Sequence, residues 1–344
     1  QDGHTTVWGT SLGDTPLLKI EPIEGKPVVT EVGTTDDMQA SGISRGMELI
    51  EVNGMPIEQI LKNEIYPYIS ASTPQSREVL AFNRLLRYDQ GTSVSATFLD
   101  LKREKFTVDL VCDLRRHRDA AFWINNTEFE FKKLPGGISY TAINGFGSKK
   151  VVEEFDKVFD KILASKSLII DVRNNGGGST GNANDIIARL IDKTCHQVSK
   201  WRTREYKPTF YALGREQEWY EGDHDAIEPR GERAFLGPVV VLIGPKTFSA
   251  AEDFLVPLKA SGRATLIGEP TGGSTGQPLF FNVYDENVYE ARAAICTKWD
   301  RYSDGTEFVG VGIQPDIPVE RTRQDIFEGK DPVLTKAMGL LTQN

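Results

Sequence analysis

Long apolar runs and basic clusters are both absent from this chain of 344 residues. The longest apolar stretches, such as Val239–Ile243, are the size of a strand and fall far short of the roughly 18 residues that a membrane-spanning helix needs. With a net charge of −9 and no extended run of Lys or Arg, the chain lacks the positive surface that attracts nucleic acid or an anionic membrane. We therefore expect neither as a partner, and no transmembrane segment.

Cysteine and histidine are scarce as well. The 3 cysteines, at 112, 195 and 296, lie far apart and give neither a zinc spacing nor a disulfide framework. Nothing else in the sequence points to a metal or an organic cofactor, so we expect none. A reaction that needs an imidazole base has only 4 candidates, which are His4, His117, His196 and His224.

The remaining composition is that of an ordinary globular protein, with 39% hydrophobic and 26% charged residues. The length suggests about two domains. The chain begins Gln1-Asp2-Gly3-His4, without Met and without a signal peptide. We expect residues 1–15 to be the end of a missing amino-terminal segment, whose removal hides any targeting signal.

Residues 16–112 read as one β-rich module. Short strand patterns at 17–20 and 28–32 precede an alternating strand at 49–52, which Asn53-Gly54 closes as a turn. A helix is expected at 77–88, followed by strands at 93–99 and 105–111. The run at 41–54 (SGISRGMELIEVNG) resembles a PDZ domain, which implies that the module captures the C-terminus of another chain as an added strand. The alternative is a small β-barrel that serves only as a spacer.

Residues 113–344 read as an α/β domain, with residues 113–128 as a connector. Buried strand patterns alternate with helical ones, and such alternation gives a mainly parallel sheet covered by helices. A polar, poorly periodic stretch at about 199–235 predicts a long surface insertion. The expected strands are 137–143, 167–172, 239–244 and 265–268, and the expected helices are 149–164, 181–192 and 249–260.

Two strand-to-helix junctions carry candidate chemistry, because ligands of open α/β sheets bind at the carboxyl ends of strands. The first ends in Gly176-Gly177-Gly178, where the backbone can approach a ligand closely; it can equally be a plain helix-start loop. The second places Ser249 at the start of a helix. A serine there is usually only an N-cap, but the same geometry suits a nucleophile whose neighbouring N–H groups hold an oxyanion.

Four runs, in this order and after a PDZ-like module, resemble the carboxy-terminal processing (tail-specific) serine peptidases. They are 168–178 (LIIDVRNNGGG), 247–252 (TFSAAE), 267–273 (IGEPTGG) and 312–316 (GIQPD). The resemblance implies an α/β core of the ClpP/crotonase type, Ser249 as the nucleophile, and an oxyanion hole from the N–H of Ala250 with that of Gly176 or Gly177.

The base differs between branches of that family. One branch uses a lysine, and the corresponding position in the run 268–275 here holds Ser274. The other branch, which includes the tricorn protease core and the interphotoreceptor retinoid-binding protein, has a histidine before the PDZ module. The run Asp2-Gly3-His4-Thr5 resembles that motif, which makes His4 the implied base. A lone histidine so close to the start of a chain is otherwise an exposed surface residue.

A carboxylate should orient the imidazole. Glu307 is the first choice, since it precedes the run 312–316 where tricorn-type relatives carry a glutamate. Glu269 is the second choice, because it lies in the loop that replaces the lysine segment. Asp171 and Arg173 are expected to brace the glycine loop as an ion pair.

The leading interpretation is a serine endopeptidase that cleaves polypeptides through an acyl-enzyme. The alternative is a non-catalytic carrier of an apolar, retinoid-like ligand, held in the cleft between the sheet and the PDZ-like module. A scaffold without chemistry would leave both glycine-rich junctions unexplained. By resemblance we expect an extracytoplasmic bacterial protein, either periplasmic, secreted or associated with the cell envelope.

Overall fold

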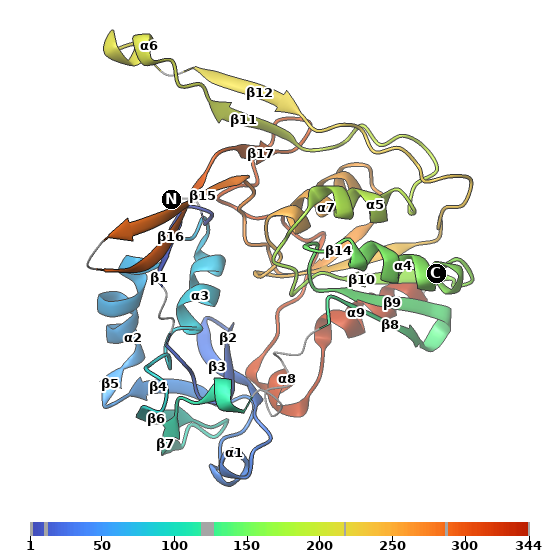
Figure 1. The fold of residues 1–344 in the computed structure, drawn as a ribbon. Helices are drawn as coiled ribbons and strands as arrows, with labels where there is room; N and C mark the ends of the chain where they lie inside the picture. The colour runs from blue at the N-terminus through green and yellow to red at the C-terminus, as the bar shows by residue number, and fades with distance from the viewer. Residues whose placement is uncertain (1–2, 10–12, 118–126, 217, 286–287, 343–344) are drawn as a thin grey trace.

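Two β-sheets dominate the computed structural model, which describes residues 3–9, 13–117, 127–216, 218–285 and 288–342 (Figure 1). The amino-terminal sheet is antiparallel, in the order β2-β3-β4-β6-β7, and β5 pairs with β4. Its elements are β2 (Leu18–Ile23), β3 (Lys26–Val32), α1 (Asp36–Ala40), β4 (Glu48–Val52), β5 (Met55–Pro56), α2 (Ile57–Ile60), α3 (Pro74–Phe82), β6 (Ser93–Leu99) and β7 (Lys105–Val111).

This sheet has a hydrophobic core of its own, which runs along the chain from Leu17 to Cys112. The turn after β4 forms as the Asn-Gly pair predicts, because Asn53 and Gly54 both have positive φ. The helix expected at 77–88 is different: α3 begins three residues earlier, after the N-cap Thr73, and ends at Phe82. Tyr88 instead pairs with Asp14 as an isolated β-bridge, which a helix continued to residue 88 could not form.

The second sheet has the order β18-β14-β13-β10-β9-β8, and every pairing except that of β8 with β9 is parallel. The α/β, mainly parallel fold predicted from the sequence is thus confirmed. Its elements are β8 (Phe129–Leu134), β9 (Ile138–Ile143), α4 (Lys150–Leu163), β10 (Ser167–Asp171), α5 (Thr180–Ile187), β13 (Val239–Ile243), α7 (Ala250–Ala260), β14 (Thr265–Gly268), β18 (Ile317–Pro318), α8 (Arg323–Glu328) and α9 (Pro332–Thr342).

Helices cover both faces of this sheet. Alternate side chains of β10 point to opposite faces: Leu168 and Ile170 pack in the cluster that holds α4, α5 and α7, whereas Ile169 packs in the cluster that holds α9. Burial on both faces explains why β10 and β13 are almost continuously apolar. None of the described helices is long and apolar enough to cross a membrane.

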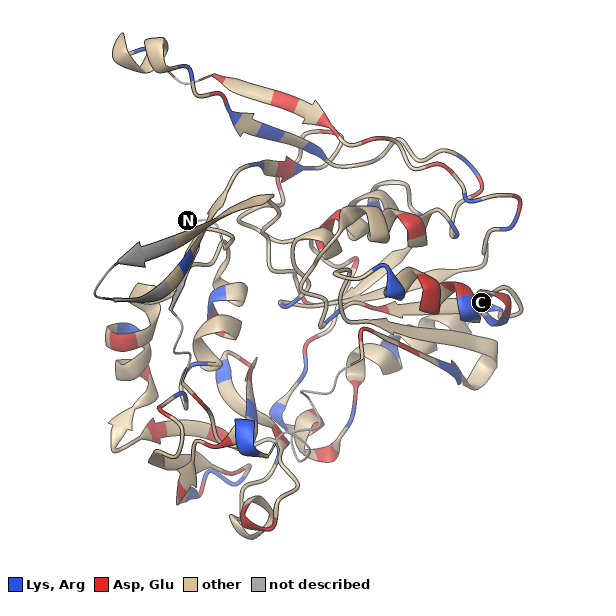
Figure 2. Ribbon diagram, viewed as in Figure 1, with Lys and Arg blue, Asp and Glu red and all other residues tan. Residues whose placement is uncertain are grey.

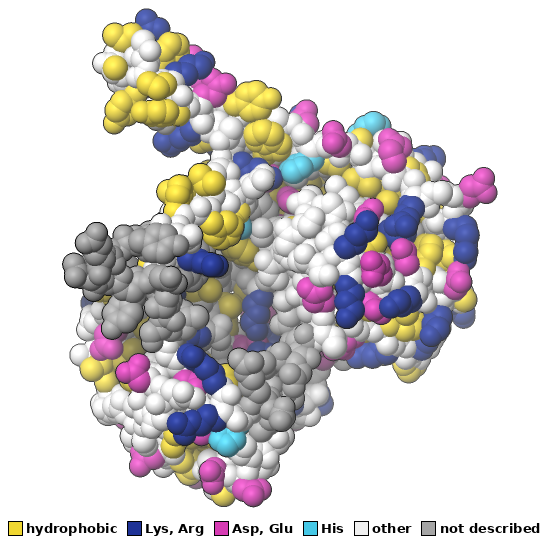
Figure 3. Space-filling model, viewed as in Figure 1, with side chains coloured by type: hydrophobic (Ala, Val, Ile, Leu, Met, Phe, Trp, Pro, Cys, Tyr) yellow, Lys and Arg dark blue, Asp and Glu magenta, His cyan; other side chains and the backbone are white. Residues whose placement is uncertain are grey.

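The expected surface insertion forms an arm that projects from the body (Figure 1). Its strands are β11 (Lys200–Arg204) and β12 (Trp219–Asp223), joined through α6 (Pro208–Ala212), and β17 (Trp299–Arg301) pairs with β11. Basic β11 faces acidic β12, with Lys200 opposite Asp223, as Figure 2 shows in blue and red. Apolar side chains gather at the arm's tip in Figure 3, and Tyr206, Tyr211 and Leu213 are exposed there.

A further small sheet, which the sequence analysis missed, joins the beginning of the chain to residues near its end. Its order is β1-β16-β15, from β1 (Thr6–Gly9), β15 (Pro278–Asp285) and β16 (Val288–Cys296), and all its pairs are antiparallel. Because β1 begins two residues after His4, this pairing carries the amino-terminal segment to the body of the molecule.

Candidate active site

Ser249 occupies a strained turn between β13 and α7. Its backbone has φ 57 and ψ −126, a conformation that a residue with a side chain rarely adopts. Such a turn lifts a side chain above the carboxyl edge of the sheet, as in the nucleophile elbows of hydrolases. The residues of β13 before it are buried, so the turn stands on a rigid base.

The glycine loop after β10 packs directly against this turn. A Cβ on Gly177, whose φ is +101, would lie 2.7 Å from the Cβ of Ser249, so glycine is required there. The backbone N–H of Phe248 donates to the carbonyl of Asn175 at 3.0 Å, and the Thr247 hydroxyl donates to the carbonyl of Val172 at 2.9 Å. The two junctions predicted from the sequence therefore form one unit.

His4 lies at the nucleophile candidate. Its Nε2 is 3.1 Å from Ser249 Oγ, and its Nδ1 is 3.0 Å from Ser274 Oγ. The imidazole stacks on the ring of Phe248, with centroids 4.8 Å apart. Of the three candidates that sequence reasoning ranked highest, the structure brings Ser249 and His4 together, and it adds Ser274 on the far side of the ring.

Three hydrogen bonds from two segments hold the segment of His4. The N–H of Gly3 donates to Ser72 Oγ at 3.0 Å, and Ser70 Oγ donates to the carbonyl of Thr5. The N–H of Cys296 in β16 donates to Thr5 Oγ1 at 3.1 Å. The position of the imidazole thus depends on the loop of Ser70 and Ser72, in the amino-terminal module, as well as on β16.

Two backbone donors near Ser249 are open. The N–H of Gly177 is engaged, because it donates to Asn175 Oδ1 at 2.9 Å. The N–H groups of Gly176 and Ala250, by contrast, make no hydrogen bond to any residue that the structure describes. A Cβ placed on Gly176 would meet nothing within 4 Å, so this side of the loop is accessible.

Glu307 is not where the sequence analysis placed it. Arg202 donates to Glu307 Oε1 at 3.3 Å, and the indole N–H of Trp299 donates to Oε2. Neither of these hydrogen bonds is the one that the sequence analysis expected, between Glu307 and the imidazole of His4. A guanidinium at the base of the arm supplies a full positive charge there, which binds a carboxylate more strongly than a neutral ring does.

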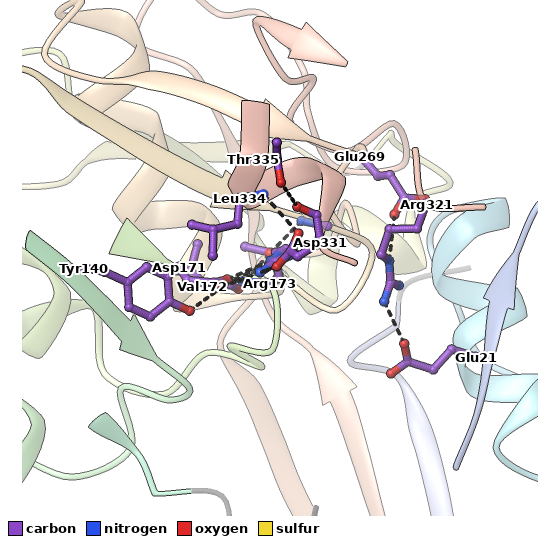
Figure 4. Close-up of polar contacts among 12 residues, drawn as sticks. Glu21, Tyr140, Asp171, Val172, Arg173, Glu269, Arg321, Asp331, Leu334 and Thr335 are labelled. Carbon is purple, nitrogen blue, oxygen red and sulfur yellow. Dashed lines mark hydrogen bonds and ion pairs between the residues drawn. The ribbon is translucent and has the colours of Figure 1, made fainter. Parts of the chain in front are cut away.

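Glu269 also lies away from the imidazole. It lines a cavity of about 440 Å³ between the two large sheets, and its Oε2 is 3.9 Å from Arg321 Nε. Burial raises the pKa of Glu269, partly offset by the charge of Arg321. Figure 4 shows Arg321 between Glu269 and Glu21, which places this pair in the contact between the sheets.

The expected ion pair at the glycine loop is present. Arg173 binds Asp171 through its side chain and also reaches Asp331 at the start of α9, with Nη2 2.7 Å from Oδ2 (Figure 4). Tyr140 on β9 donates to Asp171 Oδ2 at 2.8 Å. This network fixes the end of β10, from which the glycine loop departs.

Sequence reasoning missed Glu252, a wholly buried carboxylate in the first turn of α7 (0% exposed). It accepts hydrogen bonds from the backbone of Ser249, Gly273 and Ser274. Burial raises the pKa of Glu252 to about 7, even though hydrogen bonds from Thr271 and these amides act to lower it. The Ser-x-x-Glu spacing, which is that of a capping box, was the signal that could have found it.

One further polar cluster lies behind α7. The possible ligand atoms of His224, Asp253 and Asp300 are within 4.8 Å of one another. The ammonium of Lys298 lies among them, 2.8 Å from Asp300 Oδ1 and 3.2 Å from His224 Nε2. Because this cation already neutralises Asp300, the cluster is a buried ion-pair group, and we assign no metal to it.

Comparison with known proteins gives a consistent result. The model of peptidase family S41 matches residues 137–319, which is more than half of the chain. The carboxy-terminal processing protease CtpA of Bacillus subtilis is 25% identical over 307 residues, which is 89% of this chain and 54% of the relative. The putative tricorn protease homolog 2 of Streptomyces coelicolor is 25% identical over 314 residues, 88% of this chain and 22% of the relative.

The similarity in structure extends further along the chain. The crystal structure of mature CPAF superposes with a TM-score of 0.76 at 17% identity, covering 100% of this chain and 85% of that one. At this level of identity the match establishes a shared fold. Since the chain spans only 54% and 22% of the two curated relatives above, their activities do not transfer to it directly.

Proposed function

Because the chain belongs to peptidase family S41, we propose that it is a serine endopeptidase with Ser249 as its nucleophile and His4 as its base. The observation that carries this proposal is the 3.1 Å contact between Ser249 Oγ and His4 Nε2 at a strained turn. A nucleophile within hydrogen-bond reach of an imidazole is the arrangement that acyl transfer needs.

The geometry supports a specific sequence of proton transfers. When His4 Nδ1 carries the hydrogen and donates it to Ser274 Oγ, Nε2 has a free lone pair that can accept the proton of Ser249. The Ser249 oxygen then attacks the carbonyl of the scissile bond. The imidazolium returns the proton to the leaving amine, and water hydrolyses the acyl-enzyme by the same route.

The oxyanion of the tetrahedral intermediate needs donors that are not already engaged. Gly176 and Ala250 meet this requirement, and Gly177 does not, because its N–H is bound to Asn175. We therefore assign the oxyanion hole to the N–H groups of Gly176 and Ala250. The close packing of Gly177 against Ser249 gives that glycine a steric role instead.

The test is to incubate the chain with dye-labelled casein, an unfolded protein, beside Ser249→Ala. We expect cleavage by the wild type only, and covalent labelling of Ser249 by a serine-directed fluorophosphonate. The matched control is Ser261→Ala, at the other end of α7, which should cleave and label like the wild type. Equal cleavage by wild type and Ser249→Ala would refute the proposal.

The apolar-ligand alternative is not favoured. It placed a ligand in the cleft between the core sheet and the amino-terminal module, and a cavity of about 440 Å³ does lie there. Charged side chains line it, among them Lys19, Glu21, Arg173, Lys246 and Arg321. Burying an apolar ligand among them would strip water from these charges without replacing it, which is costly.

We further infer that the amino-terminal module binds the substrate's C-terminus in the manner of a PDZ domain. A groove of about 380 Å³ there is lined by Leu49, Ile50 and Phe82, by the acidic residues Glu48, Glu58 and Glu78, and by the cation of Lys26. Apolar and basic side chains of the substrate suit most of this lining, and the terminal carboxylate suits Lys26. Matched peptides with a free or an amidated C-terminus test the idea, since capture in the manner of a PDZ domain requires the free carboxylate.

An extracytoplasmic location and a polypeptide substrate complete the proposal. Both follow from the likeness to carboxy-terminal processing peptidases. Fractionation of the source cells, followed by detection of the protein, tests the location: recovery with the cytosolic fraction would contradict it.

A further inference from the structure

Glu252 joins the two halves of the candidate site. Its Oε1 accepts from the N–H of Gly273 at 2.8 Å and from the hydroxyl of Thr271. Its Oε2 accepts from the N–H of Ser274 at 2.9 Å and from that of Ser249 at 3.3 Å. The donors are neutral, and three of the four are backbone groups.

Two of these donors belong to residues whose side chains form the candidate site. Ser249 holds the nucleophilic hydroxyl, and Ser274 Oγ contacts Nδ1 of the imidazole at 3.0 Å. The N–H of Ser249 also donates to the carbonyl of Ser274 at 3.0 Å, which ties the two residues together directly. A shift of the loop 271–274 would therefore move the partner of His4 relative to the nucleophile.

We propose that Glu252 is a positioning residue, whose ionised carboxylate holds the loop 271–274 against Ser249 and so sets the alignment of His4 with the nucleophile. The inference rests on the proposed peptidase function and deepens it. Glu252 touches neither substrate nor the reacting atoms, because it is wholly buried beneath the loop.

An ionised carboxylate satisfies this set of donors best. Each of its oxygens accepts at least one backbone N–H, so both oxygens must be acceptors. A glutamine replaces one oxygen by an amide nitrogen, which only donates, so an N–H of Gly273 or Ser274 loses its partner whichever way the amide is oriented. Protonation of the glutamate turns one oxygen into a hydroxyl, which is a weaker acceptor than a carboxylate oxygen.

Protonation of Glu252 should thus weaken the site. Because its pKa lies at about 7, the carboxylate loses its charge as the pH falls through neutrality. Titration of Glu252 would therefore contribute to the acid side of the activity profile. Replacing Glu252 by glutamine removes that contribution, and this gives the proposal a signature that lost packing alone does not produce.

The test compares Glu252→Gln with Glu51→Gln, a glutamate on β4 that lies outside both the candidate site and the groove of the amino-terminal module and pairs with Lys105. The rate of fluorophosphonate labelling of Ser249 is measured from pH 6 to 9. We expect Glu252→Gln to label roughly 10- to 100-fold more slowly at pH 8, the loss that about 1 Å of misalignment causes. The acid side of its pH profile should be shallower than that of the wild type, and Glu51→Gln should label like the wild type.

A second readout does not depend on activity. The ¹⁵N shifts of the His4 imidazole report the hydrogen bond at Nδ1, and we expect them to change in Glu252→Gln and not in Glu51→Gln. If the wild type neither labels nor cleaves casein, the peptidase function fails, and these shifts still decide the role of Glu252. Wild-type labelling rates, pH profile and shifts in folded Glu252→Gln would overturn the inference.

Glu252→Asp covers the case in which the glutamine variant does not fold. The aspartate keeps the negative charge, but its side chain is shorter by one methylene. The loop 271–274 must therefore shift toward it or lose its hydrogen bonds. A slower labelling rate in a protein that still unfolds cooperatively supports the positioning role. A wild-type rate in that variant would count against it.

Discussion

Two buried glutamates bind the segment that carries Ser249, and their pKa values shift in opposite directions. Glu21, on β2, contacts Lys246, Arg321 and Lys19. Burial acts to raise its pKa, but the three cations outweigh burial and hold the pKa of Glu21 far below its usual range. Glu252 has only neutral donors, and burial raises its pKa to about 7.

The difference teaches what each contact is for. A carboxylate surrounded by cations stays charged at every ordinary pH, so Glu21 acts as a permanent tie between the amino-terminal sheet and the loop of Lys246, three residues before the nucleophile. A buried carboxylate whose partners are neutral dipoles can have a pKa near 7, so the charge of Glu252 can change with pH. The contact of Glu21 holds the amino-terminal sheet against the core, and the contacts of Glu252 affect the candidate active site.

The largest expected effect follows from Glu21→Gln. This change removes the counter-charge of Lys246 and leaves Arg321 only the more distant carboxylate of Glu269, and it should lower the free energy of unfolding by about 3 kcal/mol. Urea denaturation at pH 7.5 measures it. The control is Glu51→Gln, which loses a more exposed pair with Lys105 and should cost about 0.5 kcal/mol. A loss below about 1 kcal/mol for Glu21→Gln would break the comparison.

The pH dependence of the two glutamates should run in opposite directions. The pKa of Glu252 is raised from 4.5 to about 7 in the folded chain, so its contribution to stability is full below pH 4.5 and is lost as the pH rises through 7. Relative to Glu252→Gln, the wild type should lose about 3 kcal/mol of unfolding free energy between pH 4.5 and 8. Denaturation of both proteins across this range measures the difference.

The penalty of Glu21→Gln should behave the other way. Because the folded pKa of Glu21 is depressed, its stabilisation is full above the unfolded value of 4.5 and declines as the pH falls below it. The penalty measured at pH 7.5 should therefore shrink at pH 4 and below. A stability difference that is flat with pH for either variant would contradict the assignment of its charge state.

Much of the core could be predicted because its signals are local. The strands at 167–172 and 239–244 are continuous apolar runs, which is what burial on both faces requires, and both form within a residue of the expected bounds. The turn at Ser249 followed from the resemblance, which also implied the contact with a histidine 245 positions away. No local sequence pattern predicts a contact between two residues so far apart in the chain.

The misses depend on contacts between distant segments. Glu252 reads as a helix-capping residue, and its bonds to Gly273 and Ser274 appear only when the chain is folded. Glu307 fits the motif expected to orient the base, yet the arm places Arg202 beside it. The hairpin of β15 and β16 was missed although its strands are rich in aromatic and β-branched residues, a signal that was present.

The smallest expected effect separates a bond that supports a helix from one that supports the site. Thr73 and Thr322 are both N-caps, of α3 and α8, and each accepts a backbone N–H of its own helix. Thr73 also donates to the carbonyl of Gly272 at 2.9 Å, next to the two amides that Glu252 holds. Either threonine changed to alanine should cost about 1 kcal/mol in urea denaturation.

Labelling of Ser249 by the fluorophosphonate should distinguish the two threonine variants. We expect Thr73→Ala to label a few-fold more slowly, because the loop 271–274 loses a support from the amino-terminal sheet's side while Glu252 still holds it from below. Thr322→Ala should label at the wild-type rate, since α8 makes its contacts with the amino-terminal sheet far from this loop. Equal labelling by both variants would mean that the bond from Thr73 does not contribute to the position of the loop, which Glu252 and the amide of Gln75 would then hold without it.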